Sequence, residues 1–215
     1  MARLTGLPAR IMAEQFRDSL QNKGYAFFEK GDYNLNIIGV RNDSGDATRF
    51  DDSINLIYKI DGSWVCDIYP ITTEPGENIL KRPIKEVRHK GTAILQPNQY
   101  RSTYIIGWHG SKNNGHTALI QRGGKVKVWR DNNRDTTPDY HGPEEDGWFG
   151  INIHKHRGSA ARVNTGGVSA GCQVFQDSRD FAEFMDTCDD ARDLYGNSFT
   201  YTLIEERDLV KKGVC

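Results

Sequence analysis

INLIYKIDGSWVCDI, at residues 54–68, carries the strongest local indication of the fold. In its first half, apolar or aromatic residues alternate with other residues: Ile54, Leu56, Tyr58 and Ile60. This two-residue period is typical of a strand with one buried face. Asp61-Gly62 favours a two-residue turn, and Trp64 to Ile68 is apolar again. The stretch therefore predicts a β-hairpin.

Further strands are predicted on both sides of this hairpin. They are residues 35–40, 91–95, 104–108, 118–121, 125–129, 148–154 and 199–203. Gly123-Gly124 makes 118–121 and 125–129 a second hairpin.

Two helices are predicted at the ends of the chain. Residues 8–23 place Ile11, Phe16 and Leu20 on one face, and a second helix begins after Asp177 and ends near Gly196. We expect a mostly β, α+β fold in one compact unit. Residues 1–45 would be a helical and strand extension packed on a catalytic domain of residues 46–215.

Composition excludes several classes of protein. The chain has 215 residues and a formal net charge of −1, so no basic excess indicates a nucleic-acid partner. It has no apolar run long enough to insert in a membrane. The first ten residues lack the apolar segment of a signal peptide. The sequence predicts synthesis in the cytoplasm, and action in the periplasm or cell wall only through another delivery route.

The four cysteines do not have the spacing of a metal site. They form no C-x-x-C pair and no zinc-knuckle pattern, and no metal or cofactor is predicted. Cys66 and Cys188 fall in strand and helix patterns, which indicates buried packing. Cys172 instead lies in a glycine- and serine-rich turn, SAGCQV, at residues 169–174.

A histidine-bearing strand precedes this turn. In GINIHKH, residues 150–156, Asn152 and His154 share one face, and His156 joins them if the strand continues. A thiol needs a nearby imidazole to become a nucleophile, and the oxyanion that forms needs N–H donors. The backbone amides of Cys172 and Gln173, together with that of Gly171, are the candidate donors. Ser169 is expected either to bind a substrate amide or to brace the turn.

His154 and the Cys172 turn resemble the catalytic signature of the L,D-transpeptidases, the YkuD-type domain. That family has a histidine, about fourteen to seventeen residues, and then Ser/Thr-His-Gly-Cys. Here fourteen residues separate His154 from Ser169-Ala-Gly-Cys172. The hairpin at 56–68 and the following Thr-Thr-Glu-Pro-Gly segment, residues 72–76, are also similar to the family pattern. The resemblance implies a YkuD-like β-sandwich with a helix after the cysteine.

The resemblance also implies roles for individual residues. Cys172 would accept the acyl group, His154 would act as base and then acid, and the Lys155 backbone carbonyl would orient the imidazole. Ser169 and Gly171 would shape the turn. The substrate would be a peptidoglycan stem peptide, and the product would come from transfer to an amine or from hydrolysis.

Three positions depart from the family pattern. Ala170 replaces the motif histidine, Gln173 replaces an apolar residue, and Val174 replaces Asn or Arg. These changes indicate a diverged member with altered substrate recognition. The stretch VWRDNNRD at residues 128–135 is similar to phage-borne versions of the domain.

Other polar residues are candidates for substrate binding. His116 and Arg101 would line the cleft, with the arginine holding a carboxylate, and His156 and Gln173 complete the predicted substrate-binding set.

Two alternative functions remain open at this point. In one, His154 and His156 hold zinc with Cys172 or His116, as in a metal-dependent peptidase. In the other, the fold is a non-catalytic module that binds cell wall or forms part of a virion. Separately, Asp131, Asn133 and Asp135 have the alternate spacing of a calcium loop, although a polar turn with Asx hydrogen bonds is the favoured explanation.

Overall fold

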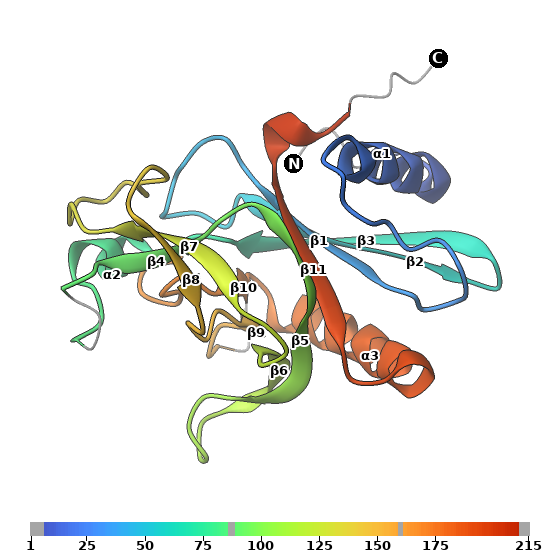
Figure 1. Cartoon of the computed structure of the whole chain (residues 1–215). Coiled ribbons are helices and arrows are strands. Elements are labelled where there is room, and N and C mark those ends of the chain that lie inside the picture. Colours follow the sequence, from blue (N-terminus) through green and yellow to red (C-terminus); the bar gives the residue numbers. More distant parts are fainter. Residues whose placement is uncertain (1–6, 86–88, 159–160, 211–215) are drawn as a thin grey trace.

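The computed structural model describes residues 7–85, 89–158 and 161–210 (Figure 1). Its helices are α1 (Ala9–Asn22), α2 (Glu77–Lys81) and α3 (Ser178–Tyr195), and a short 3-10 helix, η2 (Glu206–Asp208), follows the last strand. Its strands are β1 (Asn36–Arg41), β2 (Asp52–Ile60), β3 (Ser63–Thr72), β4 (Thr92–Leu95), β5 (Asn98–His109), β6 (His116–Gln121), β7 (Val126–Asp131), β8 (Glu144–Gly147), β9 (Ile153–Lys155), β10 (Gln173–Phe175) and β11 (Phe199–Glu205). The expected mostly β, α+β class agrees with this structure.

Eight strands form a closed barrel in the order β1-β11-β5-β6-β9-β10-β3-β2. The resemblance implied a β-sandwich, whereas the structure has a closed barrel. The difference arises at β9 and β10, which pair in parallel and bridge the gap between β6 and β3. A separate three-stranded sheet has the order β4-β7-β8.

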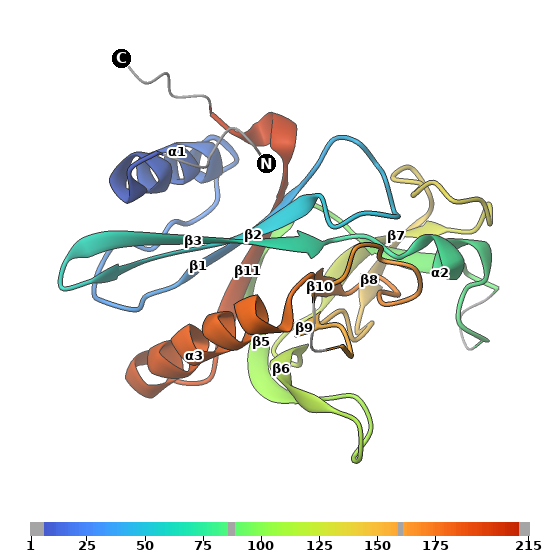
Figure 2. The ribbon, with the colours of Figure 1, turned by 180° about the vertical axis from the view of Figure 1, so that it is seen from behind.

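The apolar character of β1 follows from its burial on both faces. Ile37 belongs to the main core, whereas Ile38 and Val40 contact a second apolar cluster that includes Phe16 and Leu20 of α1. Figures 1 and 2 show α1 and α3 on opposite sides of β1–β3. A strand covered on both faces needs a continuous apolar run, and residues 35–40 have one.

The N-terminal segment is part of the barrel. β1 pairs in parallel with β11 and antiparallel with β2, so residues on both sides of position 45 contribute strands to the same barrel. Within the described residues, no helix is long and apolar enough to cross a membrane.

A hydrogen bond inside the barrel links the last strand to the cysteine turn. The Tyr201 hydroxyl donates to Oε1 of Gln173 across 2.8 Å, and both side chains are fully buried. Gly39 on β1 leaves room for this tyrosine, because a Cβ at residue 39 would lie 2.8 Å from its Cζ and closer still to its hydroxyl oxygen. The glycine is therefore required by a close approach and not by its backbone angle.

We expect Gly39→Ala to destabilise the protein by about 1–3 kcal/mol, the usual cost of overpacking a core. Urea unfolding measures this change. Gly167→Ala is the matched control, since a Cβ there meets nothing within 4 Å. Tyr201→Phe should cost less in the Gly39→Ala background than in wild type, because there it also removes the atom nearest the added Cβ. Equal stability of the two glycine variants would contradict the steric argument.

Candidate active site

The turn that carries Cys172 depends on a glycine in the left-handed region. Gly171 has φ +114°, and a Cβ at this residue would clash with the backbone carbonyl oxygen of Ala93 on β4. Any other residue would meet both penalties at once. Gly171, which the resemblance implies shapes the turn, thus also allows the close approach of a neighbouring strand.

Ser169 braces the same turn from within. Its hydroxyl donates to the Cys172 carbonyl oxygen across 2.8 Å and accepts from the Gly171 N–H across 3.1 Å. Its own carbonyl accepts from the N–H of Gly76 across 3.0 Å, which ties the turn to the segment after β3. Of the two roles predicted for Ser169, the geometry fits the bracing role.

The Cys172 thiol is held in contact with the backbone that leads into β9. The Asn152 N–H donates to Sγ across 3.4 Å, and the thiol donates to the Gly150 carbonyl across 3.6 Å. Burial raises the pKa of Cys172 to about 11, although the Asn152 N–H lowers it somewhat. At rest the Cys172 side chain is therefore a neutral thiol.

His154 lies on β9, directly beside the strand that follows the cysteine. The register pairs Gln173 with Ile153, which aligns Cys172 with Asn152, so His154 lies two positions further along on the same face. Two residues of a strand span about 6.6 Å. Among the described residues no imidazole is hydrogen bonded to Sγ, so direct proton transfer between the two side chains needs a rearrangement of one of them.

The tautomer of His154 follows from its neighbour. Nδ1 lies 2.7 Å from the Lys155 backbone oxygen, which can only accept, so Nδ1 carries the proton and Nε2 keeps a free lone pair. This contact is the one that the family resemblance implies. The side chain is 6% exposed, and burial, with a further contribution from His109, lowers the pKa of His154 to about 3. The imidazole is a neutral base at any ordinary pH.

His109, which was not among the predicted site residues, stacks directly on His154. The two ring centroids are 4.0 Å apart, with 21° between the ring planes. The Asn152 amide fixes the second ring: Oδ1 accepts from the Gln121 N–H, so Nδ2 faces and donates to Nδ1 of His109 across 2.9 Å. In the sequence, His109 and His116 flank one loop. This arrangement is typical of a hairpin that places two histidines opposite each other, and β5 and β6 form that hairpin.

His116 completes a group of three imidazoles. It pairs with His109 across β5 and β6, and its ring lies 5.4 Å from His109 and 6.0 Å from His154. Burial and the neighbouring His109 lower the pKa of His116 to about 4. Its Nε2 is buried and has no hydrogen-bond partner among the described residues. The structure thus brings His116 to the predicted site.

Two other predicted residues lie away from this group. β9 ends at Lys155, so His156 does not share the face of His154; its ring contacts the Gln176 carbonyl and the Gly158 N–H. Arg101 stands over the Phe28 ring, 5.3 Å from its centroid, at the far end of β5 from His109. The predicted role of Arg101 in holding a substrate carboxylate at Cys172 has no geometric basis.

Gln173 braces the site and does not face a substrate. Its side chain is buried between Tyr201 and the Gly171 carbonyl, and its N–H donates to the Asn152 carbonyl across 2.9 Å. The Gly171 N–H is occupied by Ser169. Of the three amides considered as oxyanion donors, the Cys172 N–H is the one with no hydrogen bond in the described part of the chain.

The geometry gives no support to a zinc centre. Across residues 7–85, 89–158 and 161–210, no group of three or more His, Cys, Asp or Glu side chains is arranged to hold a metal ion. His156 uses both ring nitrogens on backbone groups, and Nδ1 of His154 faces a carbonyl.

The acidic loop after β7 forms a polar turn. Asn133 Oδ1 accepts from the Asp135 N–H, and Asp135 Oδ1 accepts from the Thr137 N–H. These are Asx turns, the simpler of the two explanations for this spacing.

Comparisons of the chain with protein-family models, with curated proteins and with solved structures found no match. The assignment of a function therefore depends on the geometry of the site and on the sequence motif.

Alkylation of Cys172 by iodoacetamide should accelerate about ten-fold per pH unit between about pH 7 and pH 10. Only the thiolate reacts, and with a pKa near 11 its fraction grows throughout this range. Mass spectrometry of the modified peptide measures the rate. Cys66, whose pKa burial raises to about 12, serves as the internal comparison. A rate that is already constant at neutral pH would contradict a neutral thiol.

Proposed function

We propose that this protein is a cysteine acyl-transfer enzyme of L,D-transpeptidase type, acting on amide bonds of peptidoglycan stem peptides. The observation that carries the proposal is a neutral His154, oriented by the Lys155 carbonyl, on the strand beside the Cys172 turn. The substrate class comes from the resemblance between the segment 154–172 and the family signature.

In the first half-reaction the Cys172 sulfur attacks the amide carbonyl carbon while its proton passes to Nε2 of His154. Both groups are neutral at rest, so proton transfer accompanies attack, as in general-base catalysis. The oxyanion that forms accepts a hydrogen bond from the Cys172 N–H. His154 then returns the proton to the leaving amine as the C–N bond breaks, leaving a thioester on Cys172.

In the second half-reaction a water molecule or an amine attacks the thioester. His154 takes the proton of the attacking group, the C–S bond breaks, and the thiol of Cys172 receives the proton. Hydrolysis and transpeptidation differ only in this acceptor, and the departures at Ala170 and Val174 fall beside the nucleophile. Assays with and without an added D-amino acid distinguish the two outcomes.

Cys172→Ala should abolish turnover of purified stem peptides, and His154→Gln should reduce it by about 10²- to 10⁴-fold, the usual contribution of a general base. Product release is followed by liquid chromatography, and intact mass reports an acyl adduct on the wild-type enzyme. Cys66→Ala is the matched control, because this thiol faces the Ala9 carbonyl of α1. Full activity in the Cys172 variant would exclude the thioester. A folded wild-type protein with no adduct and no turnover would favour the non-catalytic module.

His109 should act as a positioning residue for the base. Removing it with His109→Ala exposes His154 and raises the pKa of His154 from about 3 toward its ordinary value. The reaction needs a neutral imidazole at His154. As the pH is lowered, His109→Ala should therefore lose activity at a higher pH than wild type does. His109→Phe keeps a ring against His154 but removes the charge contribution of His109 to its pKa, so the activity of this variant should fall at a pH between those of wild type and His109→Ala. A profile that is identical in wild type and both variants would contradict this role.

A further inference from the structure

A pocket of about 730 Å³ lies at the end of the barrel where β1 and β11 finish. This size falls within the range of small-molecule sites. Its walls come from separate segments around residues 41–45, 97, 129, 140–144 and 205–207. None of the residues of the candidate active site lines it.

The floor of the pocket holds a buried arginine with one donor unused. Arg41 is 2% exposed; its Nε donates to the Thr73 hydroxyl across 3.0 Å, and its Nη2 donates to the carbonyls of Thr73 and Leu95 across 3.2 and 2.9 Å. Nη1 is buried and has no partner in the described residues. An atom this deeply buried is out of reach of a ligand in the pocket, and Nε also lies 3.7 Å from Oε1 of Glu74, so the role of Arg41 is to fix the floor.

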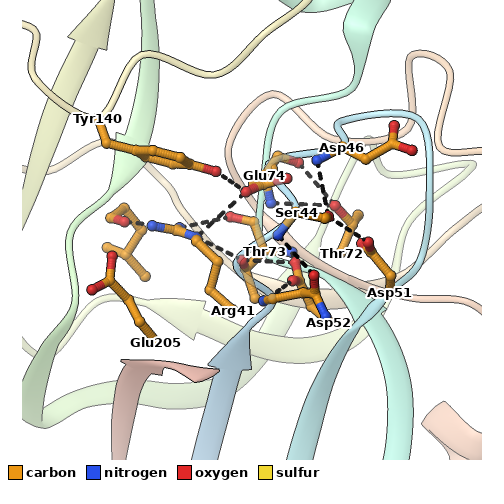
Figure 3. A network of polar contacts seen from close by, with 12 residues as sticks. Arg41, Ser44, Asp46, Asp51, Asp52, Thr72, Thr73, Glu74, Tyr140 and Glu205 are labelled. Carbon is orange, nitrogen blue, oxygen red and sulfur yellow. Dashed lines mark hydrogen bonds and ion pairs between the residues drawn. The ribbon is translucent and has the colours of Figure 1, made fainter. Parts of the chain in front are cut away.

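Two aromatic rings form a wall above Arg41. The guanidinium lies 5.2 Å from the Tyr140 ring centroid, and the Tyr140 hydroxyl donates to Glu74, as Figure 3 shows. Trp129 meets Tyr140 with ring centroids 5.8 Å apart and an angle of 66°. Because Tyr140 is held by both Glu74 and Arg41, the wall is fixed before any ligand arrives.

The charges around the pocket nearly cancel. Its lining contains the carboxylates of Asp43, Glu144 and Glu205 and the guanidinium groups of Arg41 and Arg207. Arg207 is already paired with Glu205. Three acidic groups disfavour a polyanion, and their oxygens accept hydrogen bonds from a ligand that is rich in donors. The lining instead suits an uncharged ligand that both donates and accepts hydrogen bonds.

We propose that this pocket binds an oligosaccharide of neutral or N-acetylated sugars. The C–H face of a sugar ring packs on Trp129 and Tyr140, and its hydroxyl groups donate to the carboxylates of Glu144 and Glu205. Sugars combine an apolar ring face with donors and acceptors at the rim, which is the combination that these residues present. The site is separate from Cys172 and does not depend on the proposed chemistry.

The test is a calorimetric titration of the full chain with the tetrasaccharide of N-acetylglucosamine. Wild type and Cys172→Ala should bind it equally, with a saturable one-site curve. Trp129→Ala should weaken binding by about ten-fold through loss of ring stacking, and Glu205→Gln by a smaller factor. Trp148→Ala is the matched control, because this tryptophan is 55% exposed and lies outside the pocket.

Three results would overturn the proposal. The first is the absence of saturable binding at millimolar tetrasaccharide. The second is binding that Trp129→Ala and Glu205→Gln leave unchanged while circular dichroism shows that both variants are folded. The third is displacement of the sugar by a sugar-free stem peptide. Failure of the Cys172 chemistry alone would leave the sugar titration unaffected, so the two proposals fail separately.

Discussion

The hydrogen bond from Tyr201 to Gln173 holds the rest of the site together. It runs across the barrel interior, where an unpaired hydroxyl or amide would cost about 1–3 kcal/mol. The Gln173 side chain also reaches the Gly171 carbonyl, so the position of the cysteine turn is set by β11 as well as by its own strand. The polar residue that replaces an apolar one in the family pattern is therefore part of the internal support.

The turn and the base are then fixed by different parts of the backbone. Ser169 and Gly76 secure the turn, and Asn152 contacts both halves of the site through its N–H to Sγ and its amide to His109. The imidazole of His154 is held by the next residue's carbonyl and covered by His109. These contacts restrict both the thiol and the imidazole. The strands that bring them together, β9 and β10, have only three residues each and depend on their neighbours in the barrel.

Much of the fold could be predicted because local patterns carry it. The hairpin around Asp61-Gly62 and the helix after Asp177 are present with nearly the expected bounds. β8 was missed because Glu144–Gly147 has no apolar alternation, and the barrel was missed because its closure depends on long-range pairing of β9 and β10. For the site, residue spacing identified His154 and Cys172. His109 contacts His154 only because the strands that carry them pair. His156 lies away from the site because β9 ends at Lys155. Local sequence patterns predict neither the pairing nor the end of this strand.

The protonated state of Cys172 has a consequence for the chemical durability of the protein. Peroxide and related oxidants attack the thiolate, which converts cysteine to sulfenic acid and then to irreversible products. With a pKa near 11, only a minute fraction of Cys172 is ionised at neutral pH. The raised pKa therefore protects the sulfur from oxidation, so Cys172 should stay reduced in surroundings that would oxidise a pre-ionised cysteine.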